Sequence, residues 1–153
     1  MSSQSSRPQE ALSTMEILIF LKKVPLFSSF GLEDLLKLKE ITETVTCEAG
    51  DFVLHEGETG NRAYIIVSGS VEVVKMDGSK ETIIATLEKP DYFGEMAIIE
   101  NQPRSASIRA KSDCVFLEID GLEFRSMMKT NAELAFNIVK VFSARIRGMM
   151  DRT

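Results

Sequence analysis

Residues 93–106 contain several residue types that together could bind a phosphate ester. Gly94 allows close backbone approach, and residues 97–101 have the length of one helical turn, whose unpaired N–H groups attract anions. Arg104 follows a proline that ends this turn, so its guanidinium can return toward the same anion, with the Ser105 hydroxyl as a further donor. The segment therefore predicts a site for one phosphodiester charge.

Glu95 lies in the same segment and extends this interpretation from a phosphate to a nucleotide. A carboxylate only accepts hydrogen bonds when it is ionised, so beside a phosphate it is better suited to bind a sugar hydroxyl. Taken separately, an arginine in a loop is usually a solvated surface charge, and a Phe-Gly-Glu triplet is common by chance. The combination at this spacing carries the prediction.

The spacing resembles the phosphate-binding cassette of the cyclic nucleotide-binding domain family, the type found in the cAMP receptor protein and the protein kinase A regulatory subunit. The cassette residues are Phe93-Gly94-Glu95-Met96-Ala97, followed after a gap of five residues by Pro103-Arg104-Ser105-Ala106. The resemblance covers residues 12–150 and includes further short motifs, namely Val24-Pro25-Leu26-Phe27, Ala49-Gly50-Asp51, Glu56-Gly57, Gly60-Asn61 with Tyr64, and Gly69.

The resemblance implies a role for each polar member of the cassette. Glu95 would bind the ribose 2′-hydroxyl and Arg104 the cyclic phosphate, with Ser105 and Ala106 as the remaining phosphate donors. The implied ligand-binding set as a whole is Phe93, Gly94, Glu95, Met96, Ala97, Arg104, Ser105 and Ala106. The implied ligand is cAMP, since bacterial cAMP readers of the family often carry serine after the arginine, whereas many cGMP readers carry threonine. The choice between cAMP and cGMP stays open on this evidence.

The residues that would cap the base are expected on the last helix, where Phe142, Arg145 and Met149 are the candidates. The chain departs from the family at Pro90, since many relatives carry a glycine just before the acidic residue that follows. It also departs after the long helix, because bacterial transcription factors of the family continue there into a helix-turn-helix domain. No DNA-reading element is visible before Thr153, so direct nucleic-acid binding is not expected.

Helical patterns flank the predicted site on both sides. Ser13 and Glu16 have the spacing of a capping box before a short helix, and residues 32–41 have an amphipathic period. Thr130 and Glu133 form a second capping-box pattern before a long apolar helix. Its apolar residues exceed what one neighbour would cover, which predicts a homodimer through Leu134, Ile138, Val141, Phe142 and Met149.

The middle of the chain alternates apolar and polar residues, which is typical of strands. The expected strands are 52–55, 64–67, 71–75, 82–87, 105–110 and 115–119, and Asp77-Gly78 is the clearest hairpin turn. The predicted fold is mainly β with flanking helices, an antiparallel jelly-roll-like β-roll with a short phosphate-binding helix. We expect a disordered tail (1–12) and one domain (13–153) with helices 13–41, a β-roll 44–119 and C-terminal helices 120–152.

Composition restricts the classes of function. The net charge of -5 provides no basic field for nucleic acid or an anionic membrane, and the early apolar run of five residues is far shorter than the ~20 of a membrane span. The single histidine, His55, argues against a metal-dependent jelly-roll enzyme, and two cysteines argue against an iron–sulfur sensor. Cys47 and Cys114 are expected to be reduced core thiols of a cytoplasmic protein.

These observations predict a non-enzymatic cyclic-nucleotide sensor without a cofactor, whose C-terminal helix moves on binding and signals to an unidentified protein effector. The alternative is a ligand-free domain of the same fold that docks to proteins. Intact Glu95 and Arg104 argue against that alternative.

Overall fold

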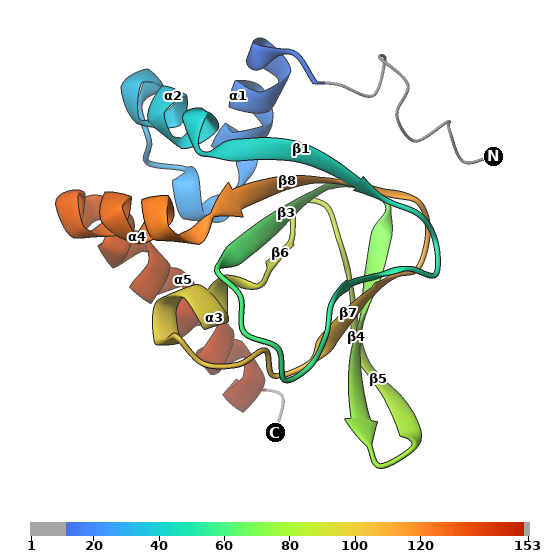
Figure 1. Ribbon diagram of the computed structural model, residues 1–153. Coiled ribbons are helices and arrows are strands. Elements are labelled where there is room, and N and C mark those ends of the chain that lie inside the picture. Colours follow the sequence, from blue (N-terminus) through green and yellow to red (C-terminus); the bar gives the residue numbers. More distant parts are fainter. Residues whose placement is uncertain (1–11, 152–153) are drawn as a thin grey trace.

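Two four-stranded antiparallel sheets form a roll in this computed structural model, which describes residues 12–151 (Figure 1). The first sheet has the order β1 (Thr42–Cys47), β8 (Cys114–Asp120), β3 (Arg62–Ser68) and β6 (Tyr92–Phe93). The second has the order β2 (Phe52–Leu54), β7 (Ser107–Ala110), β4 (Ser70–Asp77) and β5 (Lys80–Glu88). The predicted mainly-β fold with flanking helices is confirmed.

Not every residue of the chain is described to the same extent. The description includes the backbone but not the side chains of Met96, Ala97, Arg145, Met149 and Asp151. The predicted tail, residues 1–12, lies outside the described residues except for Leu12, which packs against the helical core.

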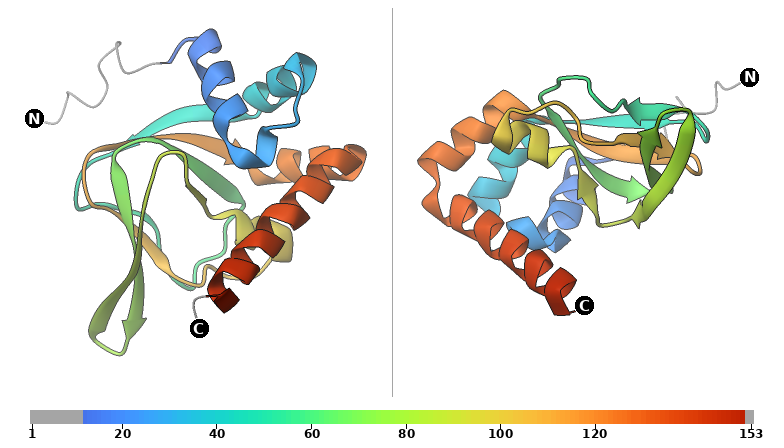
Figure 2. Two further views of the ribbon diagram at one scale, coloured as in Figure 1. Left: turned by 180° about the vertical axis from the view of Figure 1, so that it is seen from behind. Right: turned by 90° about the horizontal axis from the view of Figure 1, so that it is seen from below.

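The helices gather at one end of the roll, and the β4–β5 hairpin projects at the other (Figure 2). They are α1 (Thr14–Lys23), the short 3₁₀ helix η3 (Pro25–Phe27), α2 (Leu32–Glu40), α3 (Glu95–Glu100), α4 (Gly121–Thr130) and α5 (Ala132–Asp151). The capping box before α1 is confirmed, because the Glu16 N–H donates to the Ser13 hydroxyl at 3.1 Å and the Ser13 N–H to the Glu16 carboxylate at 2.9 Å.

The central strands of the first sheet are buried on both faces, because the helices cover one face and the second sheet covers the other. On β3, Tyr64 and Ile66 point into the roll, whereas Ala63 and Ile65 join the helical core. On β8, Phe116 lies inside the roll and Leu117 lies against the helices. This alternation explains why both strands have long apolar runs with few polar interruptions.

The second capping box predicted from the sequence is wrong. Thr130 is the last residue of α4, and its hydroxyl donates to the carbonyls of Ser126 and Met127 at 3.2 Å and 3.3 Å. Asn131 caps α5 instead, since its side-chain oxygen accepts from the Leu134 N–H at 3.1 Å. The Asn131 side chain, one residue after Thr130, therefore accepts the hydrogen bond at the start of α5 that the Thr-x-x-Glu pattern assigned to Thr130.

The stripe of α5 that was predicted to form a homodimer is largely internal. Leu134 and Ile138 are buried in the helical core, and Val141 and Phe142 pack against it. The exposed apolar residues of α5 lie on a different stripe, formed by Phe136, Val139, Ile146 and Met150.

Although α5 has 20 residues, no helix within residues 12–151 combines the length and apolar character needed to cross a membrane.

The two cysteines, distant in the sequence, lie directly opposite each other on β1 and β8. Both are free thiols, with Cys114 buried and Cys47 half-buried. Burial is the main cause that raises the pKa of Cys47 to about 11, and the acidic groups around it add to the effect. Cys47 is therefore a weakly reactive thiol at neutral pH.

Candidate functional site

A cavity of about 350 Å³ lies at the mouth of the roll, between the second sheet and the segment that begins at β6. Six of the predicted site residues line it: Phe93, Gly94, Glu95, Arg104, Ser105 and Ala106. The other two, Met96 and Ala97, lie in the first turn of α3 directly after Glu95, and their side chains are outside the described atoms. The structure thus brings together the two halves of the motif around one space.

The opposite wall of this cavity is apolar, and its residues were not among the sequence candidates. It consists of Leu54 on β2, Val73 on β4, Leu87 on β5 and Ile108 on β7. These side chains come from all four strands of the second sheet. The alternation of apolar and polar residues along each strand predicts which side chains point inward. Only the closed roll shows that these four side chains face the cassette.

Arg104 is the central cation of the site and is only 7% exposed. Its Nη1 donates to the Gly94 carbonyl at 2.8 Å, and its Nη2 donates to the Arg62 carbonyl at 2.9 Å. A guanidinium has five N–H donors in a planar fork, so donors remain beyond these two bonds. The two carbonyls fix the plane of the guanidinium beside the cavity without neutralising its charge.

The backbone of Arg104 is held as firmly as its side chain. The Arg104 N–H donates to the Glu58 carbonyl, and the Gly57 N–H donates to the Arg104 carbonyl, both at 2.8 Å. The loop between β2 and β3 therefore pairs with Arg104 like a short strand. Both ends of the arginine are positioned before any ligand arrives.

Two glycines are required by this packing. Gly94 has a φ of 86°, and a Cβ there would lie 2.9 Å from the Arg62 carbonyl and 3.1 Å from Nη1 of Arg104. A Cβ on Gly60 would lie 2.8 Å from Nη2 of Arg104. The guanidinium therefore fits between two backbone segments that approach closely because they lack side chains.

The electrostatic environment of Arg104 favours the arrival of an anion. Burial lowers the pKa of Arg104 from its ordinary value, while Tyr64 and Glu95 act in the opposite direction. Arginine stays protonated even so, and a buried charge is stabilised by pairing with an opposite charge. A singly charged phosphodiester in the cavity would provide that pairing.

The short helix α3 connects the cavity to the helical core. It begins at Glu95 beside the cavity, and Ile98, 3% exposed, is buried among the helices together with Phe124. The Ile98 carbonyl accepts a hydrogen bond from Nη1 of Arg125 on α4 at 2.9 Å. The helix α3 is therefore in contact with both the cavity and α4.

Of the three predicted base-capping residues, only Phe142 has a described side chain, and it does not line the cavity. Phe142 packs against the helical core, and the side chains of Arg145 and Met149 are outside the described atoms. Their role as a cap stays a prediction.

Metal ligation is not indicated in the part of the chain that the structure describes. No group of three His, Cys, Asp or Glu side chains there could hold a metal ion. The ring of His55 is stacked on Phe52 with the ring centres 5.1 Å apart.

Comparison with known proteins gives matches along most of the chain. The family model described as "Cyclic nucleotide-binding domain" matches residues 44–131. The cAMP-dependent protein kinase regulatory subunit of Schizosaccharomyces pombe is 33% identical over 117 residues, which cover 76% of this chain and 28% of that protein. The chain thus spans less than a third of that curated relative.

Solved structures agree with this family match. A cyclic nucleotide-binding domain from Methylobacillus flagellatus has 26% identity and a TM-score of 0.74, with 90% of this chain and 80% of that chain covered. The regulatory subunit of a cAMP-independent protein kinase A from Trypanosoma brucei also has 26% identity, with a TM-score of 0.72, and 85% of this chain and 47% of that chain are covered.

Proposed function

Because the chain belongs to the cyclic nucleotide-binding domain family, we propose that it is a non-enzymatic sensor that binds cAMP in the cavity beside Arg104. The observation that carries this proposal is the buried guanidinium, which two carbonyls orient and do not neutralise. Such a group stabilises a single negative charge far better than a solvated arginine does.

The lining of the cavity suits the parts of a cyclic nucleotide. Arg104, with the Ser105 hydroxyl and the Ala106 N–H, offers donors to the phosphate, and Glu95 offers an acceptor to the ribose 2′-hydroxyl. The apolar wall of the second sheet would take the sugar and base by contact. The described residues that line the cavity include no histidine or cysteine, and binding rather than hydrolysis is the proposed activity.

The proposed role of Glu95 is tested with 2′-deoxy-cAMP. The unaltered chain is expected to bind this analogue about tenfold more weakly than cAMP, because the charge-assisted hydrogen bond to the 2′-hydroxyl is lost. Glu95→Gln keeps only a neutral acceptor, so it should distinguish the two ligands less than the unaltered chain does. Calorimetric titration of both proteins with both ligands measures this, and a Glu95→Gln protein that still distinguishes them like the unaltered chain would refute the role.

Two of the matched proteins differ in whether their names refer to cAMP as the ligand, so we keep a second hypothesis about ligand binding. The S. pombe relative is named for cAMP, whereas the T. brucei structure is titled as cAMP-independent. The fold is therefore compatible with a different ligand or with a docking domain. Titration with cAMP and cGMP separates a sensor for either nucleotide from a docking domain, which would bind neither.

We propose that the output is a movement of the helical layer, passed on to another protein chain. The link is α3, whose first residue lines the cavity and whose Ile98 is buried with α4. Closure of α3 on the phosphate would change the hydrogen bond between Arg125 and the Ile98 carbonyl.

The two free thiols support the proposed cytoplasmic location.

We also propose that α5 pairs with α5 of a second copy, through its exposed stripe rather than the internal one. Phe136, Val139, Ile146 and Met150 are 58–67% exposed and, with Ser143 between them, follow the alternating spacing of three and four residues found in coiled coils. Glu133 flanks one end of this stripe and Arg147 the other. An antiparallel pair would place these opposite charges together at both ends.

Light scattering on the full chain measures this pairing. We expect a dimer for the unaltered chain and a monomer for the double variant Val139→Glu, Ile146→Glu, because two charges in the stripe cannot be buried. Leu32→Glu, at an equally exposed leucine on α2, is the matched control and should stay dimeric. A monomeric unaltered chain at high micromolar concentration, with and without cAMP, would overturn the dimer.

A further inference from the structure

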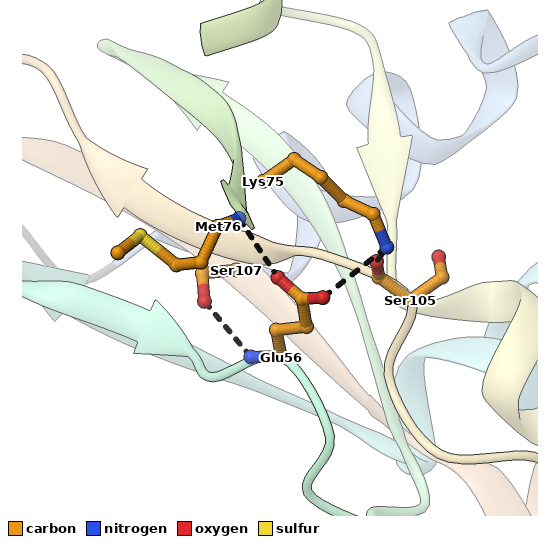
Figure 3. A network of polar contacts seen from close by, with 5 residues as sticks. All are labelled: Glu56, Lys75, Met76, Ser105 and Ser107. Carbon is orange, nitrogen blue, oxygen red and sulfur yellow. Dashed lines mark hydrogen bonds and ion pairs between the residues drawn. The ribbon is translucent and has the colours of Figure 1, made fainter. Parts of the chain in front are cut away.

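A lysine from the projecting hairpin reaches the loop that follows Arg104 (Figure 3). Lys75 on β4 donates to the Ser105 carbonyl at 2.6 Å and to Glu56 at 3.2 Å. The Glu56 carboxylate also accepts from the Met76 N–H at 3.2 Å, and the Glu56 N–H donates to the Ser107 hydroxyl at 2.8 Å. Three segments that are distant in the sequence are thus joined at one edge of the cavity.

The contact fixes the orientation of one peptide group. In a trans peptide the C=O and the following N–H point in opposite directions. Since Lys75 holds the Ser105 carbonyl on the hairpin side, the N–H of Ala106 is directed away from the hairpin. Within residues 12–151, no acceptor is found for the N–H of Ser105 or Ala106, and both residues line the cavity.

The charge of Lys75 strengthens the same peptide group as a donor. A cation at a carbonyl oxygen polarises the peptide, so its N–H becomes a better hydrogen-bond donor to an anion. Glu56 keeps the ammonium in place, and its own pKa is lowered by the Met76 N–H and by Lys75, which keeps it ionised. Lys75 is half-exposed, so the effect acts mainly through this short hydrogen bond rather than through buried charge.

We propose that Lys75, held by Glu56, is a positioning residue that presents the Ala106 N–H to the bound phosphate. This inference rests on the proposed function, because it assigns a role within the same site. It requires no contact between Lys75 and the nucleotide.

The test uses Lys75→Met, which keeps an unbranched side chain of similar size and removes its charge and donors. We expect cAMP affinity to fall about fivefold to tenfold, as for the loss of one partly exposed charge-assisted hydrogen bond. Lys75→Arg keeps the positive charge and the donors, so it should retain most of the cAMP affinity of the unaltered chain. Lys80→Met removes the same charge from the same hairpin at an exposed residue whose side chain makes no hydrogen bond or ion pair with residues 12–151, and its effect should stay within about twofold.

A second readout, the amide proton resonance of Ala106 measured by NMR without ligand, does not depend on binding. It should shift upfield in Lys75→Met and remain in place in Lys80→Met, since a hydrogen bond to the carbonyl deshields the neighbouring amide proton. If the unaltered chain binds no cyclic nucleotide, the proposed function fails. The Ala106 resonance still tests the hydrogen bond between Lys75 and the Ser105 carbonyl in that case. An unchanged Ala106 resonance, or equal loss of affinity in both lysine variants, would overturn the positioning role.

Discussion

Arg104→Ala is expected to weaken cAMP binding by about tenfold to a hundredfold, which corresponds to the ~1.5–3 kcal/mol of a charge-assisted hydrogen bond. The guanidinium is buried beside the cavity, and its plane is set by the carbonyls of Gly94 and Arg62. A solvated arginine would give a much smaller loss, because water would already screen it. Calorimetric titration with cAMP measures the change.

The controls for this substitution distinguish geometry from charge. Arg104→Lys keeps the charge and loses the planar fork, so an intermediate affinity is expected. Arg109→Ala removes an arginine that instead contacts Glu72 and Glu81, and its affinity should stay within about twofold of the unaltered chain. Equal losses for the Arg104 and Arg109 variants would contradict the assignment, and thermal melting of each variant checks that it is folded.

Phe116→Ala should lower the free energy of unfolding by about 3–5 kcal/mol, as for other large aromatic side chains truncated in a core. Phe116 is 1% exposed and packs edge-on against the rings of both Tyr64 and Phe93. Since Phe93 lines the cavity, the resulting void lies directly behind the site. Denaturant unfolding measures the loss, and we also expect weaker cAMP binding.

Ile84→Ala is the matched control for this core substitution. Ile84 is 56% exposed on β5, so its truncation should change the free energy of unfolding by no more than about 0.5 kcal/mol. A cost of less than about 1 kcal/mol for Phe116→Ala would mean that the interior of the roll is not packed as described.

The parts of the fold that depend on local sequence were predictable. The Gly78-Ser79 turn joins β4 and β5 as expected from the Asp77-Gly78 signal, and Ser13 caps α1. Strand β6 has only two residues, which is too short for an alternating pattern to be recognised. The buried stripe of α5 depends on where the roll lies, so periodicity alone indicated an amphipathic helix and not which apolar residues face inward.

The candidate site likewise has residues that the sequence predicted and residues that it did not. Gly94, Glu95 and Arg104 are close in sequence, so their spacing was sufficient to place them together. Val73 and Lys75 lie on β4, which pairs with β7 directly after the cassette, and no sequence pattern connects them to the cassette. Their part in the site follows only from the pairing of β4 with β7.

The central claim is that the cavity beside Arg104 binds a cyclic nucleotide, and the most direct test is calorimetric titration of the unaltered full chain with cAMP and with cGMP. We expect saturable binding of cAMP, with one site per chain and a dissociation constant in the micromolar range or tighter. A folded chain that releases or absorbs no saturable heat with either nucleotide would contradict the claim and favour a docking domain.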